Sequence, residues 1–429
     1  MILPARLRKR LNQLADAFWP LPALLSLLGV LGAVGLVSLD RSGVLPPWLM
    51  DNAWVYNGGG TGARTLLGAI ASSTIGVAGT VFSITIAALS LAAGQMGPRL
   101  LRNFTHDRGV QVTLGTFLGT FSYALMVLRS VRTQTEGAFT PHLSLTVGIV
   151  LALVCLATLI YFVGHMAGRI NVDTVIDLVA DDLRSAIGRL TVDEPGLVSP
   201  AESFWEGAAL VTDPRRGYLQ HLDVDRLADW AAAHGTAVGL LVRPGDYVFP
   251  GAPIARLTVE VEGAGEAIRD ATALNSVRVS ADDLEFAIRQ LVEVAVRALS
   301  PGINDPHTAI SALDRLAAAL CDVAPVFLPT GVHRRHDRLA LVVPAVDYDG
   351  VVDGMFHMIR QNTAGSAAVL IRMLDVLTAV AHCEHAPARR GTLRRHAELV
   401  LADANRTVGN ASDLHDLRAR HAAFEQATR

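Results

Sequence analysis

Lysine is almost absent from this sequence. Lys9 is the single lysine among 429 residues, and nearly all other cationic side chains are arginine. A phosphate-binding loop of the type GxxxxGK[ST], a Schiff-base lysine and a lysine for biotinyl or lipoyl attachment are therefore excluded beyond the N-terminal tail. Cysteine is also scarce, with Cys155, Cys321 and Cys383 far apart in the chain. Three such cysteines exclude a four-cysteine zinc site and argue against a disulfide-stapled fold.

Charged side chains are scarce in residues 1–165, which carry 11 basic and 5 acidic residues. The rest of the chain carries 26 basic and 35 acidic residues. This contrast predicts a lipid-embedded part joined to an ordinary water-soluble part, and it excludes a purely soluble enzyme or a mostly disordered chain. The acidic second part also argues against a nucleic-acid partner, because phosphates need a basic patch.

Four apolar stretches are long enough to cross a bilayer, which takes about 20 helical residues. They lie at about 20–39, 66–93, 110–128 and 143–165. The first could instead be a signal peptide, but its length, the lack of a clear cleavage site and the three later stretches favour an uncleaved span. The basic N-terminal tail and the basic connection between the second and third stretches predict both termini in the cytoplasm.

Small and hydroxyl-bearing residues interrupt the second stretch at helical spacing, and more follow in the third, which also contains a Gly115-xxx-Gly119 pair. One interpretation is close helix packing, since small residues let helix backbones approach each other in lipid. Another, compatible with the first, is the water-facing wall of a pore in an oligomer. The pore-lining or helix-packing candidates are Ser72, Gly76, Gly79, Thr80, Ser83, Thr116 and Thr120.

No aspartate, glutamate, lysine or arginine lies inside the four stretches. Because such groups usually mark proton relays and ion-coupling sites, their absence counts against a proton-coupled transporter or pump. Between the second and third stretches the chain carries Arg99, Arg102 and Arg108. These arginines either anchor the span ends to lipid phosphate or ring a cytoplasmic pore mouth and favour anions.

Three segments together resemble a known family. They are GTVFSITIAALSLAAGQMGPRLLRNFTHDRGVQVTLGTFLGTFSYALMVLR, GYLQHLDVDRLADWAAAHGTAVGLLVRPGDYVFPGAPIARL and LNSVRVSADDLEFAIRQLVEVAVRALSPGINDPHTAISALDRL, spread over residues 79–316. The chain resembles the bacterial predicted membrane proteins grouped as domain of unknown function 2254. The resemblance implies an inner-membrane protein with four N-terminal spans and a cytoplasmic domain, and it brings no catalytic residues with it.

The domain organisation follows from these patterns. We expect a four-span transmembrane domain at 1–165, a juxtamembrane helix and linker at 166–205, a small β-rich subdomain at 206–262, and a mainly helical α+β cytoplasmic subdomain at 263–429. In the β-rich subdomain, alternating residues and the turn Pro244-Gly245-Asp246 resemble the hairpin barrels of biotinyl and lipoyl carriers. The acceptor lysine is missing, so only the barrel scaffold is expected.

One polar turn separates two predicted helices in the soluble part. Asn304 and Asp305 lie in this turn and either form a helix-turn-helix corner or bind an ion or a neighbouring subunit. Three other constellations suggest a metal but lack further ligands, so no metal site is predicted. They are His382-Cys383-Glu384-His385, the basic loop around His333 and His336, and Asp347-x-Asp349-Gly350.

The sequence favours a homo-oligomeric, channel-like protein that passes an ion or small solute and is gated by its cytoplasmic domain. The alternative is a membrane-anchored cytoplasmic sensor or scaffold without transport activity. The motifs GxSxG, HExxH and GxGxxG after a strand are all missing, so neither an enzyme nor a cofactor is expected.

Overall fold

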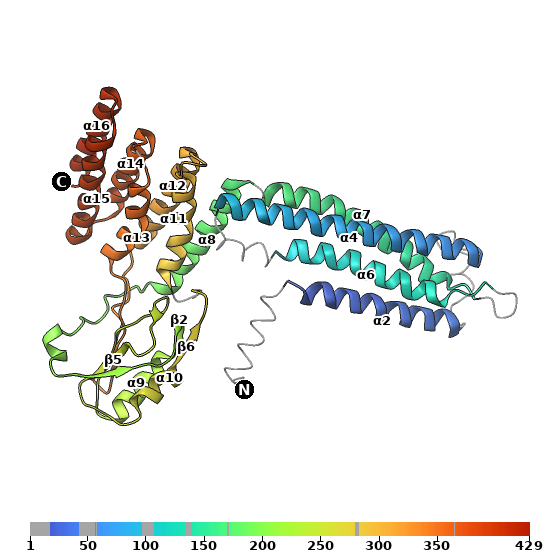
Figure 1. Ribbon diagram of the computed structural model, residues 1–429, viewed down its shortest axis with the longest axis horizontal. Coiled ribbons are helices and arrows are strands. Elements are labelled where there is room, and N and C mark those ends of the chain that lie inside the picture. The colour runs from blue at the N-terminus through green and yellow to red at the C-terminus, as the bar shows by residue number, and fades with distance from the viewer. Residues whose placement is uncertain are drawn as a thin grey trace. The chain divides into compact units, whose positions relative to one another are not determined.

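The computed structural model describes residues 18–42, 56, 58–96, 107–133, 139–169, 171–278, 283–363 and 365–429. The chain folds into two units, Met1–Asn171 and Val172–Arg429. In Figure 1 the helices of the first unit are blue to green, and the second unit runs from green to red.

Four long helices make up the described part of the first unit (Figure 1). Each is long and apolar enough to cross a membrane, so every predicted span corresponds to such a helix. α6 packs against the other three and is the most buried, whereas α2 and α7 expose leucine, valine and isoleucine side chains that suit contact with lipid. The helices are α2 (Pro20–Ser42), α4 (Gly60–Met96), α6 (Arg108–Ser130) and α7 (His142–Arg169).

An aspartate accepts hydrogen bonds from a helix N-terminus at each end of this bundle. Asp40, near the end of α2, accepts hydrogen bonds from the backbone N–H groups of Leu143 and Ser144 at the start of α7, at 3.1 and 3.0 Å. At the other end, Asp107 caps α6 by accepting from the N–H of Gly109 at 2.8 Å. Both carboxylates satisfy backbone donors that a helix N-terminus leaves unpaired.

The helices of the second unit stack in two layers (Figure 1). α11, α13 and α15 contact one another in sequence order in one layer, and α12, α14 and α16 do so in the other. α8 packs against the first pair, α11 and α12. The helices are α8 (Val172–Leu190), α11 (Leu284–Ala298), α12 (Pro306–Val323), α13 (Tyr348–Gln361), α14 (Ala367–Cys383), α15 (Pro387–Thr407) and α16 (Ala411–Ala427).

The β-rich part of this unit contains two sheets. The five-stranded sheet has the order β1 (Ala209–Thr212), β5 (Pro253–Leu257), β3 (Val238–Leu240), β8 (Arg338–Val342) and β7 (Val332–Arg335). Its neighbours are antiparallel except for the parallel pair β3 and β8. The three-stranded sheet has the order β4 (Tyr247–Val248), β2 (Gly217–Leu222) and β6 (Thr272–Asn275). The short helices are η2 (Glu202–Trp205), α9 (Val224–Ala233) and α10 (Ala264–Ala271).

The expected hairpin barrel is wrong. In the described chain both sheets are open, with β1 and β7 at the edges of one and β4 and β6 at the edges of the other. The turn at Pro244-Gly245-Asp246 connects β3 to β4, and these strands enter different sheets instead of closing one hairpin. The larger sheet also takes in β7 and β8, which lie outside 206–262. Local alternation predicts strands, whereas their partners depend on pairing between distant segments.

Candidate functional site

α4 has a packed face and a free face. Because successive residues of a helix are about 100° apart, residues three, four and seven positions apart share one face. On the face that meets the rest of the bundle, the buried residues include Leu67, Ala71, Thr74, Ala78 and Val81. On the opposite face lies the predicted stripe, here called the α4 stripe, whose members are all exposed: Ser72, Gly76, Gly79, Thr80 and Ser83.

The α4 stripe has no partner within the described part of its own chain. A methyl group added to Gly76 or Gly79 would meet no described atom within 4 Å. The hydroxyl of Thr80 donates to the carbonyl of Gly76 at 3.2 Å, and that of Ser83 donates to the carbonyl of Gly79 at 2.9 Å. These hydroxyls are satisfied by the helix itself. The stripe therefore packs no helix of the described chain, and it leaves a shallow face open to lipid, water or another molecule.

Large apolar side chains border the α4 stripe. Ile75, Phe82 and Ile86 are exposed, to 41%, 49% and 47% respectively. A free helix face of glycine and hydroxyl groups beside such side chains differs from an ordinary lipid-facing surface, where large apolar residues predominate. The stripe is therefore the candidate functional surface of the first unit.

The α6 candidates lie elsewhere. Thr120 is buried inside the bundle, where the thiol of Cys155 on α7 donates to its hydroxyl at 3.2 Å. Thr116 is half-buried and donates to the carbonyl of Val112 on its own helix at 2.8 Å. The structure therefore does not place Thr116 and Thr120 on one surface with the α4 stripe.

The glycine pair of α6 packs closely, as the helix-packing interpretation predicts. A methyl group on Gly119 would lie 2.8 Å from the carbonyl oxygen of Leu25 on α2, and one on Gly29 would lie 2.2 Å from the carbonyl oxygen of Gly119. A methyl group on Gly115 would lie 3.1 Å from the Cα of Pro22. The two helix backbones are therefore in direct contact, and this contact requires glycine.

Of the three arginines between the second and third predicted spans, Arg108 is exposed and begins α6, whereas Arg99 and Arg102 lie outside the described residues. Next to Arg108, the carboxylate of Asp107 accepts from Nε2 of His165 at 2.7 Å. This pair was not predicted from the sequence. An aspartate before a predicted span is a recognisable N-cap signal, but its histidine partner comes from the far end of another helix.

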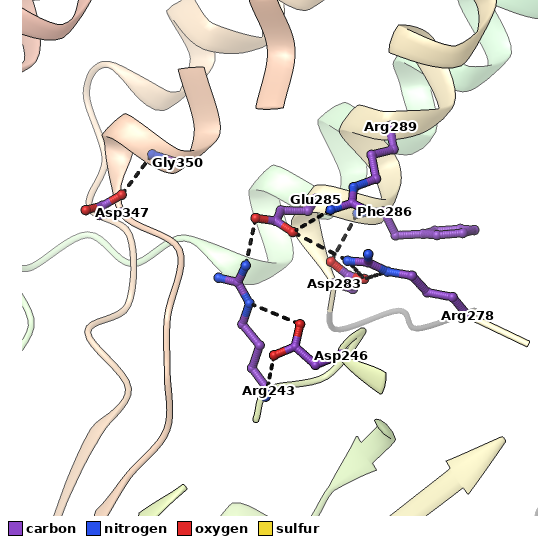
Figure 2. A network of polar contacts seen from close by, with 9 residues as sticks. All are labelled: Arg243, Asp246, Arg278, Asp283, Glu285, Phe286, Arg289, Asp347 and Gly350. Carbon is purple, nitrogen blue, oxygen red and sulfur yellow. Dashed lines mark hydrogen bonds and ion pairs between the residues drawn. The ribbon is translucent and has the colours of Figure 1, made fainter. Parts of the chain in front are cut away.

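The second unit contains a half-buried cluster of charges (Figure 2). We call it the α11 ion cluster; it consists of Arg243, Arg278, Asp283 and Glu285. Nη2 of Arg243 lies 2.7 Å from Oε1 of Glu285, and Nη2 of Arg278 lies 2.8 Å from Oδ2 of Asp283. Asp283 also caps α11 by accepting from the N–H of Phe286 at 3.0 Å. Burial raises the pKa of Asp283, although the adjacent Arg278 acts in the opposite direction.

The α11 ion cluster joins the β-rich part to the helices. Arg243 belongs to the segment between β3 and β4, while Asp283 and Glu285 belong to the start of α11. Gly245 has a φ of +99°, and a methyl group there would lie 2.1 Å from Oδ2 of Asp283. Two arginines face two carboxylates, so their charges balance. The α11 ion cluster therefore connects two subdomains and is not an open anion-binding site.

A cavity of about 270 Å³ lies beside the α11 ion cluster. Arg243 and Glu285 line it together with apolar residues such as Leu222 and Val343. His333 also lines it, and burial lowers the pKa of this imidazole. His333 was expected in a basic loop; it lies on strand β7 instead, and that part of the expectation is wrong.

Asn304 and Asp305 form the corner between α11 and α12. Oδ1 of Asp305 accepts from the N–H groups of His307 and Thr308 at 3.1 and 3.2 Å, and Oδ2 accepts from the hydroxyl of Thr308 at 2.6 Å. Asn304 has a φ of +50°, which asparagine tolerates better than most residues. Both residues therefore have a structural role as a turn and a helix cap.

The other motifs also have structural roles. Nδ1 of His382 bonds to the carbonyl of Thr378 within α14 at 2.8 Å. Asp347 caps α13 by accepting from the N–H of Gly350 at 2.8 Å, and Asp349 accepts from the hydroxyl of Thr392. A different group, Asp353 with two histidines, was not predicted from the sequence, because one of its members comes from another helix.

Comparisons with known proteins identify the family. Residues 15–379 match the family described as "Predicted membrane protein (DUF2254)". An uncharacterized protein of Mycobacterium tuberculosis is 32% identical over 418 residues, which is 94% of this chain and 79% of the relative. An uncharacterized protein of Mycobacterium bovis has the same identity and the same coverage. No solved structure is significantly similar. The chain belongs to the DUF2254 family of predicted membrane proteins.

Proposed function

We propose that this protein is a homo-oligomeric, channel-like protein of the bacterial inner membrane. In each copy the α4 stripe faces neighbouring copies and a shared water path. The observation that carries the proposal is that the stripe lies on the face of α4 opposite the one packed in the bundle. A surface used only for packing within one chain would be covered by that chain.

Membrane physics favours another copy as the neighbour of this face. Lipid tails are as apolar as leucine, so helices associate in a bilayer through close packing, which small residues permit. Gly76 and Gly79 allow such an approach, while the large neighbours Ile75 and Phe82 border the contact. The hydroxyls of Thr80 and Ser83 keep a free lone pair for water when the face lines a path.

The cytoplasmic gating part of the proposal rests on charge and chain order. The basic N-terminal tail favours a cytoplasmic position for both termini. The second unit begins at Val172, directly after the end of α7 at Arg169 and two connecting residues. A rearrangement of the cytoplasmic unit would therefore pull on a membrane helix through a very short connection. The permeant species is an ion or a small solute.

Reconstitution tests the proposal. The purified full-length chain is placed in liposomes, assayed for flux of several cations and anions over a range of pH, and its subunit number is measured by native mass spectrometry. We expect several copies per particle and a measurable flux. A monomeric particle that passes none of these ions would overturn the proposal, and an oligomer without flux would favour the scaffold alternative.

A matched pair of variants ties the flux to the α4 stripe. Gly79→Leu places a large side chain on the stripe, and Ile86→Leu keeps a large side chain beside it on the same helix. We expect Gly79→Leu to abolish most of the flux or the assembly, whereas Ile86→Leu should behave as the parent protein. Equal flux in both variants would contradict the assignment of the path to this face.

A further inference from the structure

Two histidines and one aspartate meet where α13 packs on α15. Asp353 and His357 are one helical turn apart on α13, and His396 comes from α15. Nε2 of His396 lies 2.8 Å from Oδ1 of Asp353, and Nε2 of His357 lies 3.1 Å from the same oxygen. One ligand atom from each of the three residues lies within 4.8 Å of the others. The group thus brings two imidazole nitrogens and a carboxylate oxygen to one point.

His396 is the most buried member of the group, and its side chain is fully enclosed by the protein. Its other ring nitrogen, Nδ1, is buried without a hydrogen-bond partner among the described residues, and the same holds for Nδ1 of His357. Nε2, which faces Asp353, is thus the single ring atom of His396 with a polar partner in the described chain.

We propose that Asp353, His357 and His396 bind one divalent transition-metal ion, with zinc as the best match. Zinc accepts imidazole nitrogen and carboxylate oxygen at about 2.0–2.2 Å in tetrahedral geometry, which places neighbouring ligand atoms roughly 3.3 Å apart. The observed separations of 2.8 and 3.1 Å are close to this value. Three protein ligands leave a fourth position for water or another ligand.

The neighbouring Arg395 offers the competing explanation. Its Nη2 lies 2.6 Å from Oδ1 of Asp353, so the guanidinium could hold the carboxylate without any metal. The Arg395 side chain is 42% exposed and can turn towards solvent. A metal ion, by contrast, would bind both histidines as well as Asp353. If the group is only an ion network, it has no saturable affinity for zinc. This difference can be measured.

The test uses the full-length protein in detergent, stripped of metal with a chelator and dialysed. Binding of zinc to this protein is measured by calorimetric titration. Cobalt(II) is titrated into the parent protein and followed by visible absorption, which reports four-coordinate geometry. We expect one zinc ion per chain and a higher thermal unfolding temperature with zinc. His357→Asn and Asp353→Asn should each weaken zinc binding by about tenfold or more.

The matched control is the double variant His382→Asn, His385→Asn, which removes another closely spaced histidine pair of the chain. Circular dichroism confirms that each variant is folded, and we expect this control to bind zinc as the parent does. The proposal fails if the parent shows no saturable binding of zinc or cobalt. It also fails if binding survives both His357→Asn and Asp353→Asn, or is lost in the control instead.

Discussion

Two helices of the first unit use small residues in opposite ways. On α6, Gly115 and Gly119 press against the backbone of α2, so that a methyl group on either glycine would collide with α2 atoms. On α4, Gly76 and Gly79 face away from the bundle, and the same methyl group would meet nothing described within 4 Å. Both pairs are glycines at helical spacing in an apolar helix. The comparison shows that this pattern predicts a close contact but not whether the partner belongs to the same chain.

The largest expected effect comes from filling the packed site. Gly119→Leu forces a side chain into the space held by the carbonyl of Leu25, and the backbones of α6 and α2 must separate. We expect a loss of about 3 kcal/mol or more in unfolding free energy, at the upper end of overpacking effects. Unfolding in detergent followed by circular dichroism measures it. A variant as stable as the parent would show that the α2–α6 contact is looser than described.

The second unit offers a matched glycine pair of its own. Gly245 and Gly251 both have positive φ. A methyl group added to Gly245 would collide with the carboxylate of Asp283, whereas one added to Gly251 would meet no described atom within 4 Å. We expect Gly251→Ala to destabilise by about 1–2 kcal/mol, from backbone strain alone. Gly245→Ala should be worse by a further 1–3 kcal/mol or so, because it also displaces Asp283. Equal effects in thermal unfolding would argue against the described contact with the α11 ion cluster.

A smaller effect on stability is expected at Asp305, whose side chain accepts hydrogen bonds within its own turn. Asp305→Ala removes the cap of α12 and should cost about 1 kcal/mol at pH 7. The Thr308 hydroxyl lowers the pKa of Asp305 in the folded protein. The contribution of this carboxylate is therefore present above its unfolded pKa of about 3.9 and is lost as the pH falls through the lower, folded value.

The pH dependence expected for Asp305 has its own control variant. Asp305→Asn keeps a capping side chain without an ionisable group, so the stability of this variant relative to the alanine variant should not change between pH 5 and the acid range. Unfolding of all three proteins across this range measures the difference. If the advantage of the parent over Asp305→Ala were unchanged in acid, the lowered pKa would be refuted.

The smallest effect on stability is expected at the free face. Gly79→Leu adds a side chain where no described atom stands within 4 Å. The unfolding free energy of the single chain should change by less than about 1 kcal/mol, with leucine the better helix former. Unfolding in detergent at a concentration where the chain is monomeric measures this. A loss as large as that of Gly119→Leu would mean that the face is covered within the chain.

Local features were predictable from the sequence, and distant pairings were not. The four spans follow from length and hydrophobicity, and the glycine pair of α6 follows from its spacing. The barrel was a wrong expectation because β3 pairs with β8 from a distant segment. The exposure of the α4 stripe could not be predicted either, because spacing shows that residues share a face and not which way the face points.

The same limit applies to the polar groups of the second unit. The Asp353 and His357 spacing is visible in the sequence, but the fully buried His396 joins them through the packing of α15 on α13. In the α11 ion cluster, Arg278, Asp283 and Glu285 are near neighbours in the sequence, while Arg243 comes from the distant segment between β3 and β4. Each group needs tertiary contacts that no local pattern encodes.

Cross-linking in native membranes tests the central claim, that the α4 stripe faces another copy, most directly. Ser83→Cys places a thiol on the stripe, and Leu153→Cys places one on an exposed position of α7. After mild oxidation and non-reducing electrophoresis, we predict a covalent dimer for Ser83→Cys, but none for Leu153→Cys or for the parent with its three cysteines. Absence of a Ser83→Cys dimer, or equal dimer formation by Leu153→Cys, would contradict the account.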